Sequence, residues 1–138
     1  MRTIDKIIIH CTATPQGRAV TVQEITRWHK ERGWLTIGYH WVIGINGEVW
    51  QGRNELQEGA HCEGQNAHSI GVCYVGGLTT DCKKEKDTRT PLQMAAMLKL
   101  VKEIKVKYPH ATVHGHNEFS AKACPSFSVK AWAKNNSL

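Results

Sequence analysis

Short runs of β-branched residues mark the predicted strands of the chain. Residues 7–9 are three consecutive isoleucines that end at His10 and precede a stretch rich in Thr, Pro and Gly. This pattern predicts a buried strand that delivers His10 to a loop at its end. Residues 69–75 predict a second strand, which two glycines terminate, and residues 111–115 predict a third.

Two further strands flank Asn46 and Gly47. Residues 39–45 and 48–51 lie on either side of this dipeptide, which is the strongest short-range signal for a hairpin with a type I′ turn. These two strands are therefore expected to pair antiparallel.

Three segments show the spacing of capped helices. Thr21 and Glu24 have the spacing of a capping box, and the helix that they begin is expected to stop at Gly33. Thr90, followed by a proline and then a glutamine, begins a second helix. Its predicted apolar stripe comprises Met94, Met97, Leu98, Val101, Ile104 and Tyr108. Ser128 caps a third helix, through residues 132–135.

These elements predict an α/β fold in a single domain that spans residues 1–138. We expect a central mixed β-sheet of about five strands, flanked by about three helices, because the hairpin supplies antiparallel pairing and the helical crossovers supply parallel pairing. Residues 78–89 are polar enough to form an exposed excursion. The fold class by itself does not name a function.

Charge narrows the function only slightly. Eighteen Lys and Arg against twelve Asp and Glu give a net charge of +6, which favours contact with polyanions such as nucleic acid, acidic lipid or bacterial cell wall. The basic residues are spread along the chain, and the run at residues 83–86 is typical of a solvated loop. No nucleic-acid-binding motif accompanies the charge, so we expect no nucleic-acid partner.

The sequence shows no membrane-crossing run and no secretory signal. We therefore expect synthesis in the cytoplasm, no membrane insertion, and a monomer. The five cysteines cannot all pair, and their irregular spacing matches neither a disulfide framework nor a zinc ribbon. At least one cysteine is therefore expected to have another role.

His10, His116 and Cys124 are the residues that most strongly suggest chemistry. Imidazole and thiolate are preferred ligands of Zn²⁺, and three protein ligands leave one position open, as in catalytic rather than structural zinc sites. Each residue also has an ordinary explanation, because histidines are often partly buried and cysteine often packs as a small apolar side chain. Spacing alone does not decide between these interpretations.

Several motifs together resemble the zinc amidases of phage lysozymes and their relatives, the peptidoglycan recognition proteins. The motifs are IIHCTAT at residues 8–14, GYHW at 38–41, SIGV at 69–72 with the glycines at 76–77, and HNE at 116–118 leading into KACPSF at 122–127. WHK at 28–30 and GW at 33–34 extend the similarity. The resemblance covers nearly the whole chain in unbroken order, and it implies the amidase fold.

The resemblance implies a set of site residues. It makes His10, His116 and Cys124 the ligands of one catalytic Zn²⁺, which would lower the pKa of a water near the substrate amide. Tyr39 and Lys122 would support the transition state, and His61 would contact the substrate in its groove. Tyr39, Lys122 and water remain alternative donors of the proton to the leaving amine. The other histidines, at positions 29, 40, 68, 110 and 114, are expected to be structural or superficial.

The function implied is that of an N-acetylmuramoyl-L-alanine amidase from a phage or prophage, acting on the muramyl peptides of peptidoglycan after release or export. A recognition protein that binds peptidoglycan without cutting it is an alternative, but the presence of Cys124 favours the enzyme. One phage lysozyme of this kind also inhibits an RNA polymerase. No residue set in the sequence supports that partner here.

Overall fold

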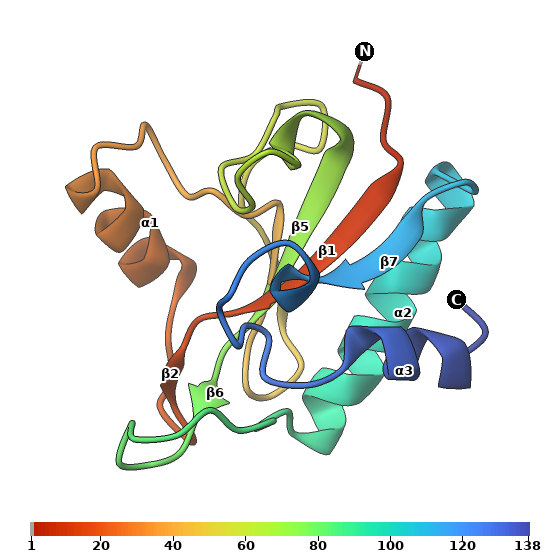
Figure 1. Cartoon of the computed structure of the whole chain (residues 1–138). Helices are drawn as coiled ribbons and strands as arrows, with labels where there is room; N and C mark the ends of the chain where they lie inside the picture. The colour runs from red at the N-terminus through yellow and green to blue at the C-terminus, as the bar shows by residue number, and fades with distance from the viewer. Residues whose placement is uncertain (1) are drawn as a thin grey trace.

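The computed structural model describes residues 2–138 of the chain (Figure 1). The strands are β1 (Lys6–Cys11), β2 (Thr14–Pro15), β3 (Trp41–Ile43), β4 (Val49–Gln51), β5 (Ser69–Tyr74), β6 (Gly77–Leu78) and β7 (Thr112–Gly115). The helices are α1 (Val22–Glu31), α2 (Pro91–Lys107) and α3 (Val129–Asn135), with short 3₁₀ turns η1 (Asn66–His68) and η2 (His116–Glu118).

The main sheet has five strands in the order β4-β3-β5-β1-β7. The hairpin strands β3 and β4 are antiparallel, whereas β3, β5, β1 and β7 run parallel to one another. The predicted α/β class, mixed sheet and three helices are therefore confirmed. A second sheet, formed by β2 and β6 with only two residues each, was not predicted, because a run this short carries no detectable period.

The strand β1 divides the interior into two layers. Ile7 and Ile9 join the larger apolar cluster with residues of α2 and α3, and Cys11 belongs to the same cluster. Because successive side chains of a strand point to opposite faces, Ile8 and His10 face the other side, where α1 covers the sheet. Figure 1 shows α1 on one side of β1 and β5, and α2 and α3 on the other.

The hairpin forms as predicted, but the turn is of another type. Gly44 donates its N–H to the Glu48 carbonyl at 2.8 Å. This bond closes a loop of three residues, 45–47. Gly47 has φ +84°, whereas Asn46 is not among the residues with positive φ. A type I′ turn requires positive φ at both central residues, so the type I′ prediction is wrong. β3 also begins at residue 41, later than predicted.

Helix α2 has the predicted capping box, in which Thr90 and Gln93 bond each other's backbone N–H groups. Its buried face differs from the predicted stripe, because Met94 is exposed and Leu98 only half-buried, while Leu100 is buried. The core-facing positions are Gln93, Met97, Leu100, Val101 and Ile104. The prediction identified Gln93 only as the capping glutamine and did not include it in the buried face.

The buried Gln93 amide ties α2 to the sheet. Its Nε2 donates to the Val75 carbonyl at 2.9 Å and approaches the Ile43 carbonyl at 3.4 Å. The Val75 carbonyl lies just after β5, and the Ile43 carbonyl, at the end of β3, already accepts the Val75 N–H at 3.0 Å. The side chain thus supplies a donor to the buried Val75 carbonyl, which would be costly to leave unpaired.

Residues 81–87 of the predicted excursion are exposed, but Thr88 is buried. The Thr88 hydroxyl accepts the Gly77 N–H at 2.8 Å, which fastens the end of the excursion to β6. All five cysteines are unpaired. Within residues 2–138, no helix has both the length and the apolar character needed to cross a bilayer.

Replacing Gln93 by Ala should destabilise the fold by about 2–3 kcal/mol, because the buried Val75 carbonyl loses its donor, the Thr90 N–H loses its capping acceptor and a cavity remains. Urea unfolding followed by circular dichroism measures the change. Lys99→Ala, on the exposed side of the same helix, is the matched control and should change the free energy of unfolding by less than about 0.5 kcal/mol. Equal stability of the two variants would contradict the role of the amide.

Candidate functional site

The predicted zinc ligands converge at one edge of the main sheet. His10 lies near the end of β1, and His116 follows β7, its parallel neighbour. Because the carboxyl ends of parallel strands lie at the same edge of a sheet, the two rings come within 4.6 Å, centroid to centroid. Cys124 lies in the loop between η2 and α3. One potential ligand atom from each residue lies within 4.8 Å of the others.

The donor set fits a zinc ion. His10 Nδ1 lies 3.8 Å from Cys124 Sγ, close to the separation of about 3.5 Å that tetrahedral Zn–N and Zn–S bonds require. The Cys11 N–H donates to Cys124 Sγ at 3.2 Å, a contact that favours a thiolate. The neighbouring Cys11 thiol and burial raise the pKa of Cys124, so a cation at the site is what would stabilise its thiolate form.

His61 lies directly behind His10. Its Nδ1 is 2.8 Å from His10 Nε2, and its Nε2 is 3.2 Å from the Ser69 hydroxyl. Because Nδ1 of His10 is directed at Cys124, the His10 proton is assigned to Nε2. His10 Nε2–H then donates to His61 Nδ1, and His61 Nε2–H donates to the Ser69 hydroxyl. Burial lowers the pKa of both rings, that of His61 to about 3, so they are neutral near pH 7.

Tyr39 and Lys122 flank the cluster. The Tyr39 ring lies 5.2 Å from the His10 ring, and burial, followed by the neighbouring thiols, raises its pKa well above the ordinary value. The phenol therefore keeps its proton and can donate a hydrogen bond. Lys122 is exposed. Burial of His116 lowers the pKa of its ring, and the positive charge of Lys122 lowers it further. Both predicted residues thus lie beside the predicted ligands.

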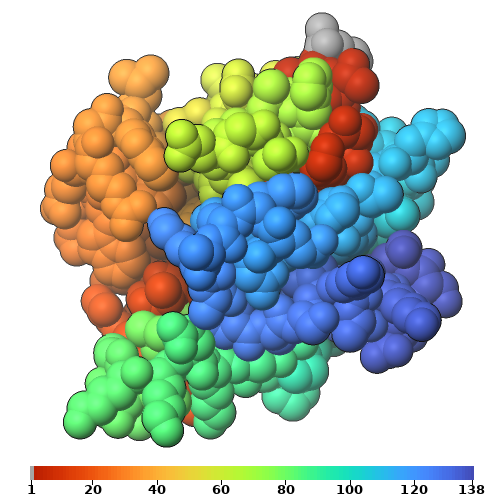
Figure 2. Space-filling model, viewed as in Figure 1, coloured from red at the N-terminus to blue at the C-terminus, as the bar shows by residue number. Residues whose placement is uncertain are grey.

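A groove of about 720 Å³ contains all six predicted site residues. In Figure 2 the orange, yellow-green and blue segments that line it meet on the face turned to the viewer. Its charged lining residues are Arg32, Glu63 and Lys122, and the aromatic ones include Trp34, Tyr39 and Phe119. Four separate segments of the chain build it, namely residues 10–13, 29–39, 60–66 and 116–124. A groove in which aromatic side chains lie beside converging polar and charged groups is a candidate ligand site.

His29 also lines this groove, although the sequence indicated only a structural role. Its Nδ1 accepts the Gly38 N–H at 2.8 Å, so the neutral ring carries its proton on Nε2. The ring packs against the rings of Trp34 and Tyr39, with centroid-to-centroid distances of 4.6 and 5.3 Å. The WHK motif, which extends the family resemblance, was the signal that could have identified it. His40 is structural as expected, since its Nδ1 accepts the Gly71 N–H at 3.0 Å.

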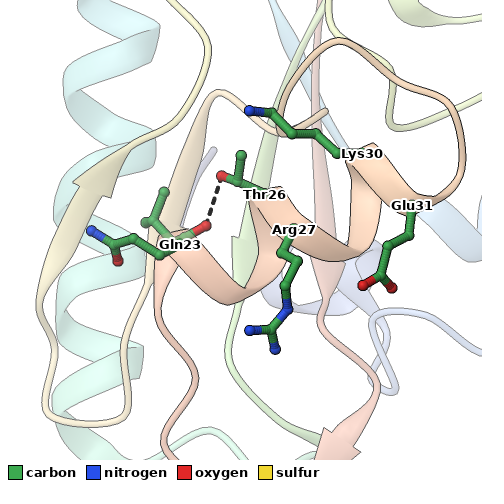
Figure 3. A pocket seen from close by; sticks show the side chains of 6 residues that line it. Gln23, Thr26, Arg27, Lys30 and Glu31 are labelled. Carbon is green, nitrogen blue, oxygen red and sulfur yellow. Dashed lines mark hydrogen bonds between the residues drawn. The ribbon is translucent and has the colours of Figure 1, made fainter.

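A second hollow, of about 520 Å³, lies along the outer face of α1 (Figure 3). It is lined by Val22, Gln23, Thr26, Arg27, Lys30 and Glu31, all from one helix. The Thr26 hydroxyl is bonded to the Val22 carbonyl at 2.7 Å, and the Lys30 and Glu31 side chains point apart in the figure. These side chains do not converge on a point, so this surface is a poor candidate for chemistry.

The chain matches a family of known proteins. The model of the N-acetylmuramoyl-L-alanine amidase family matches residues 1–127. The chain belongs to this amidase family. The endolysin of Escherichia phage T7 is 45% identical to this amidase over 135 residues, which cover 97% of the chain and 88% of the endolysin.

Other relatives extend the match to solved structures. The amidase LysC from Clostridium intestinale superposes with a TM-score of 0.85 at 28% identity, covering 99% of the chain and 87% of LysC. A peptidoglycan-recognition protein of Drosophila melanogaster is 29% identical, over 91% of the chain and 72% of its own length. The predicted resemblance is confirmed. The family match and the endolysin relatives indicate N-acetylmuramoyl-L-alanine amidase activity.

Acid should destabilise the amidase partly through His29. Burial lowers the pKa of this ring from 6.5 to about 4, so below pH 6.5 the unfolded chain binds the proton more readily than the folded one. Its contribution, at most about 3 kcal/mol, is present above pH 6.5 and lost as the pH falls toward 4. His29→Asn keeps an acceptor for Gly38, and the loss of stability between pH 6.5 and 4.5 should become smaller.

The free energy of unfolding of the metal-free protein, measured by urea titration at a series of pH values, tests this expectation. His110→Asn is the control, because it makes the same replacement at an exposed position. Parallel pH profiles for wild type and His29→Asn would contradict the assignment.

Proposed function

We propose that the chain is a zinc-dependent endolysin that hydrolyses the amide between the lactyl group of N-acetylmuramic acid and the L-alanine of the stem peptide. The observation that carries the proposal is the convergence of His10, His116 and Cys124 donor atoms within 4.8 Å of one another in the groove. Two imidazoles and one thiolate are a set that zinc prefers. The amidase and peptidoglycan-recognition relatives support peptidoglycan as the polymer bound.

A zinc ion bound there would polarise the scissile carbonyl and lower the pKa of a water beside it. The residues of the chain supply the remaining functions. Tyr39, a phenol that keeps its proton, donates a hydrogen bond to the oxygen on which negative charge develops, and the Lys122 ammonium stabilises the same charge. The leaving amine takes up a proton from one of these groups or from water.

His61 is assigned a supporting role in this proposal. Both of its ring nitrogens have protein partners, in His10 and Ser69. A ring in this arrangement fixes the tautomer and the orientation of a metal-binding histidine. Only the edge of the His61 ring that lines the groove would remain to contact a substrate. We therefore propose that His61 acts first on the affinity for the metal, and only second on the substrate.

Digestion of purified peptidoglycan, with and without a chelator, tests the activity. The wild type should release free stem peptides, as identified by mass spectrometry, and chelation should stop the release. Cys124→Ser should bind zinc at least tenfold more weakly and lose turnover, because it replaces a soft anionic ligand. Wall retention without release of peptides would instead support a recognition protein, and full activity of Cys124→Ser would exclude the ligand assignment.

Tyr39→Phe separates catalysis from metal binding. The variant should keep wild-type zinc content and affinity while turnover falls by about 10²-fold, the effect expected on losing a donor to a developing oxyanion. Tyr108→Phe is the control, because the Tyr108 hydroxyl bonds Glu55 instead, and it should retain full activity. An equally active Tyr39→Phe enzyme would remove Tyr39 from the mechanism.

His61→Asn distinguishes the two roles of His61. If the ring orients His10, zinc affinity should fall about tenfold, a typical effect of losing a group behind a metal ligand, while KM at saturating zinc stays within twofold. Competition with a chromophoric chelator measures the affinity, and His110→Asn serves as control. Unchanged zinc affinity with a raised KM would assign His61 to the substrate instead.

A further inference from the structure

The candidate ligand Cys124 is carried by a turn, not by a helix or a strand. The Ser126 N–H donates to the Ala123 carbonyl at 2.7 Å and closes this turn around Cys124 and Pro125. Ser126 has φ +71°, in the left-handed region that costs a non-glycine residue of order 1–3 kcal/mol. Such a turn keeps its shape only if contacts from the rest of the protein hold it.

Tyr74, the last residue of β5, holds the residue adjacent to Cys124 from the larger apolar layer. Its side chain is fully buried, and its hydroxyl donates to the Pro125 carbonyl at 2.6 Å. Burial raises the pKa of this phenol well above the ordinary value, so the hydroxyl stays protonated and remains a donor. Pro125 is buried as well, and its carbonyl would lose a needed partner without Tyr74.

The register of the sheet brings this contact opposite another one. Tyr74 is the partner of Cys11 in the parallel pairing of β5 with β1. The Cys11 N–H donates to the sulfur of Cys124 at 3.2 Å, while the Tyr74 hydroxyl bonds the next residue of the turn. Two adjacent strand ends therefore hold the turn, one at the sulfur of Cys124 and the other at the carbonyl of Pro125.

The other contacts of the turn act further along the chain. The Ser126 hydroxyl donates to the Gly77 carbonyl at 2.9 Å. The Arg89 guanidinium stacks over the Phe127 ring at 3.5 Å, and Asp87 holds that guanidinium at 3.0 Å. These contacts fix the far end of the turn, and Tyr74 fixes the residue adjacent to Cys124.

We infer that Tyr74 is a positioning residue for the metal centre, which holds the Cys124 sulfur at the distance from His10 that a metal ion requires. The inference rests on the proposed function, because it assumes that Cys124 binds the ion. Tyr74 does not touch the groove. Its effect reaches the reaction only through the position of the sulfur.

Tyr74→Phe removes the hydroxyl and keeps the ring, so the core packing is preserved. Zinc affinity, measured by competition with a chromophoric chelator, should fall about tenfold, in the range typical of groups behind a metal ligand. In the cobalt-substituted protein, the sulfur-to-cobalt absorption band should shift or weaken. Tyr108→Phe, which also loses one tyrosine hydroxyl, should bind zinc within twofold of wild type and give its cobalt spectrum.

Unfolding of the metal-free variants separates positioning from general stability. If Tyr74 were only a structural residue, zinc affinity and the cobalt spectrum of the folded variant would match wild type even where its stability falls, and the inference would be overturned. Ser126→Ala provides a second variant, since it loosens the same turn through the Gly77 contact and should weaken zinc binding in the same direction. Absence of zinc binding by the wild type would overturn the proposed function itself, and this inference with it.

Discussion

The parallel pairing of β1 with β5 and β7 is the constraint on which the rest of the structure depends. Residues 7–9 are completely buried, and a strand without exposed side chains can be accommodated only between two neighbouring strands and two covering layers. This position fixes the direction in which β1 runs. It also fixes the edge of the sheet at which the chain leaves it, and the candidate metal centre lies at that edge.

Alternation along β1 separates the two tasks of the centre. His10 faces the α1 layer, where His61, Tyr39 and the groove lie, whereas Cys11 faces the α2 and α3 layer together with Tyr74. The turn that carries Cys124 closes over the ends of both strands. The candidate site residues His10, His61 and Tyr39 therefore lie on one face of the sheet, while the cluster on the opposite face packs against Cys124.

The elements that the sequence predicted well are those that local interactions determine. The capping boxes at Thr21 and Thr90 and the cap at Ser128 lie within a few residues of the groups they bond, and all three are present. The predictions of the turn type at Asn46 and of the buried face of α2 were wrong because tertiary packing decides both. Of the two central residues only Gly47 takes positive φ, and Gln93 turns inward, where its amide bonds the distant Val75 carbonyl.

The same distinction applies to the site. Residue types and the resemblance to a family identified His10, His116 and Cys124, which the fold brings together. The partners of these residues could not be predicted, because the bond between His61 and His10 spans 51 positions and that between Tyr74 and Pro125 also spans 51. Periodicity and short motifs contain no information on contacts at this separation.

The candidate ligand atoms come from positions 10, 116 and 124, so more than a hundred residues must be folded before they meet. An unfolded chain has no such arrangement, and a cation held by all three residues therefore binds only the folded state. Mass action then couples occupancy to folding, and an ion at a thousand times its dissociation constant adds about 4 kcal/mol to the stability. Availability of the metal would thus influence not only how fast the enzyme works but also how long each molecule resists unfolding and proteolysis.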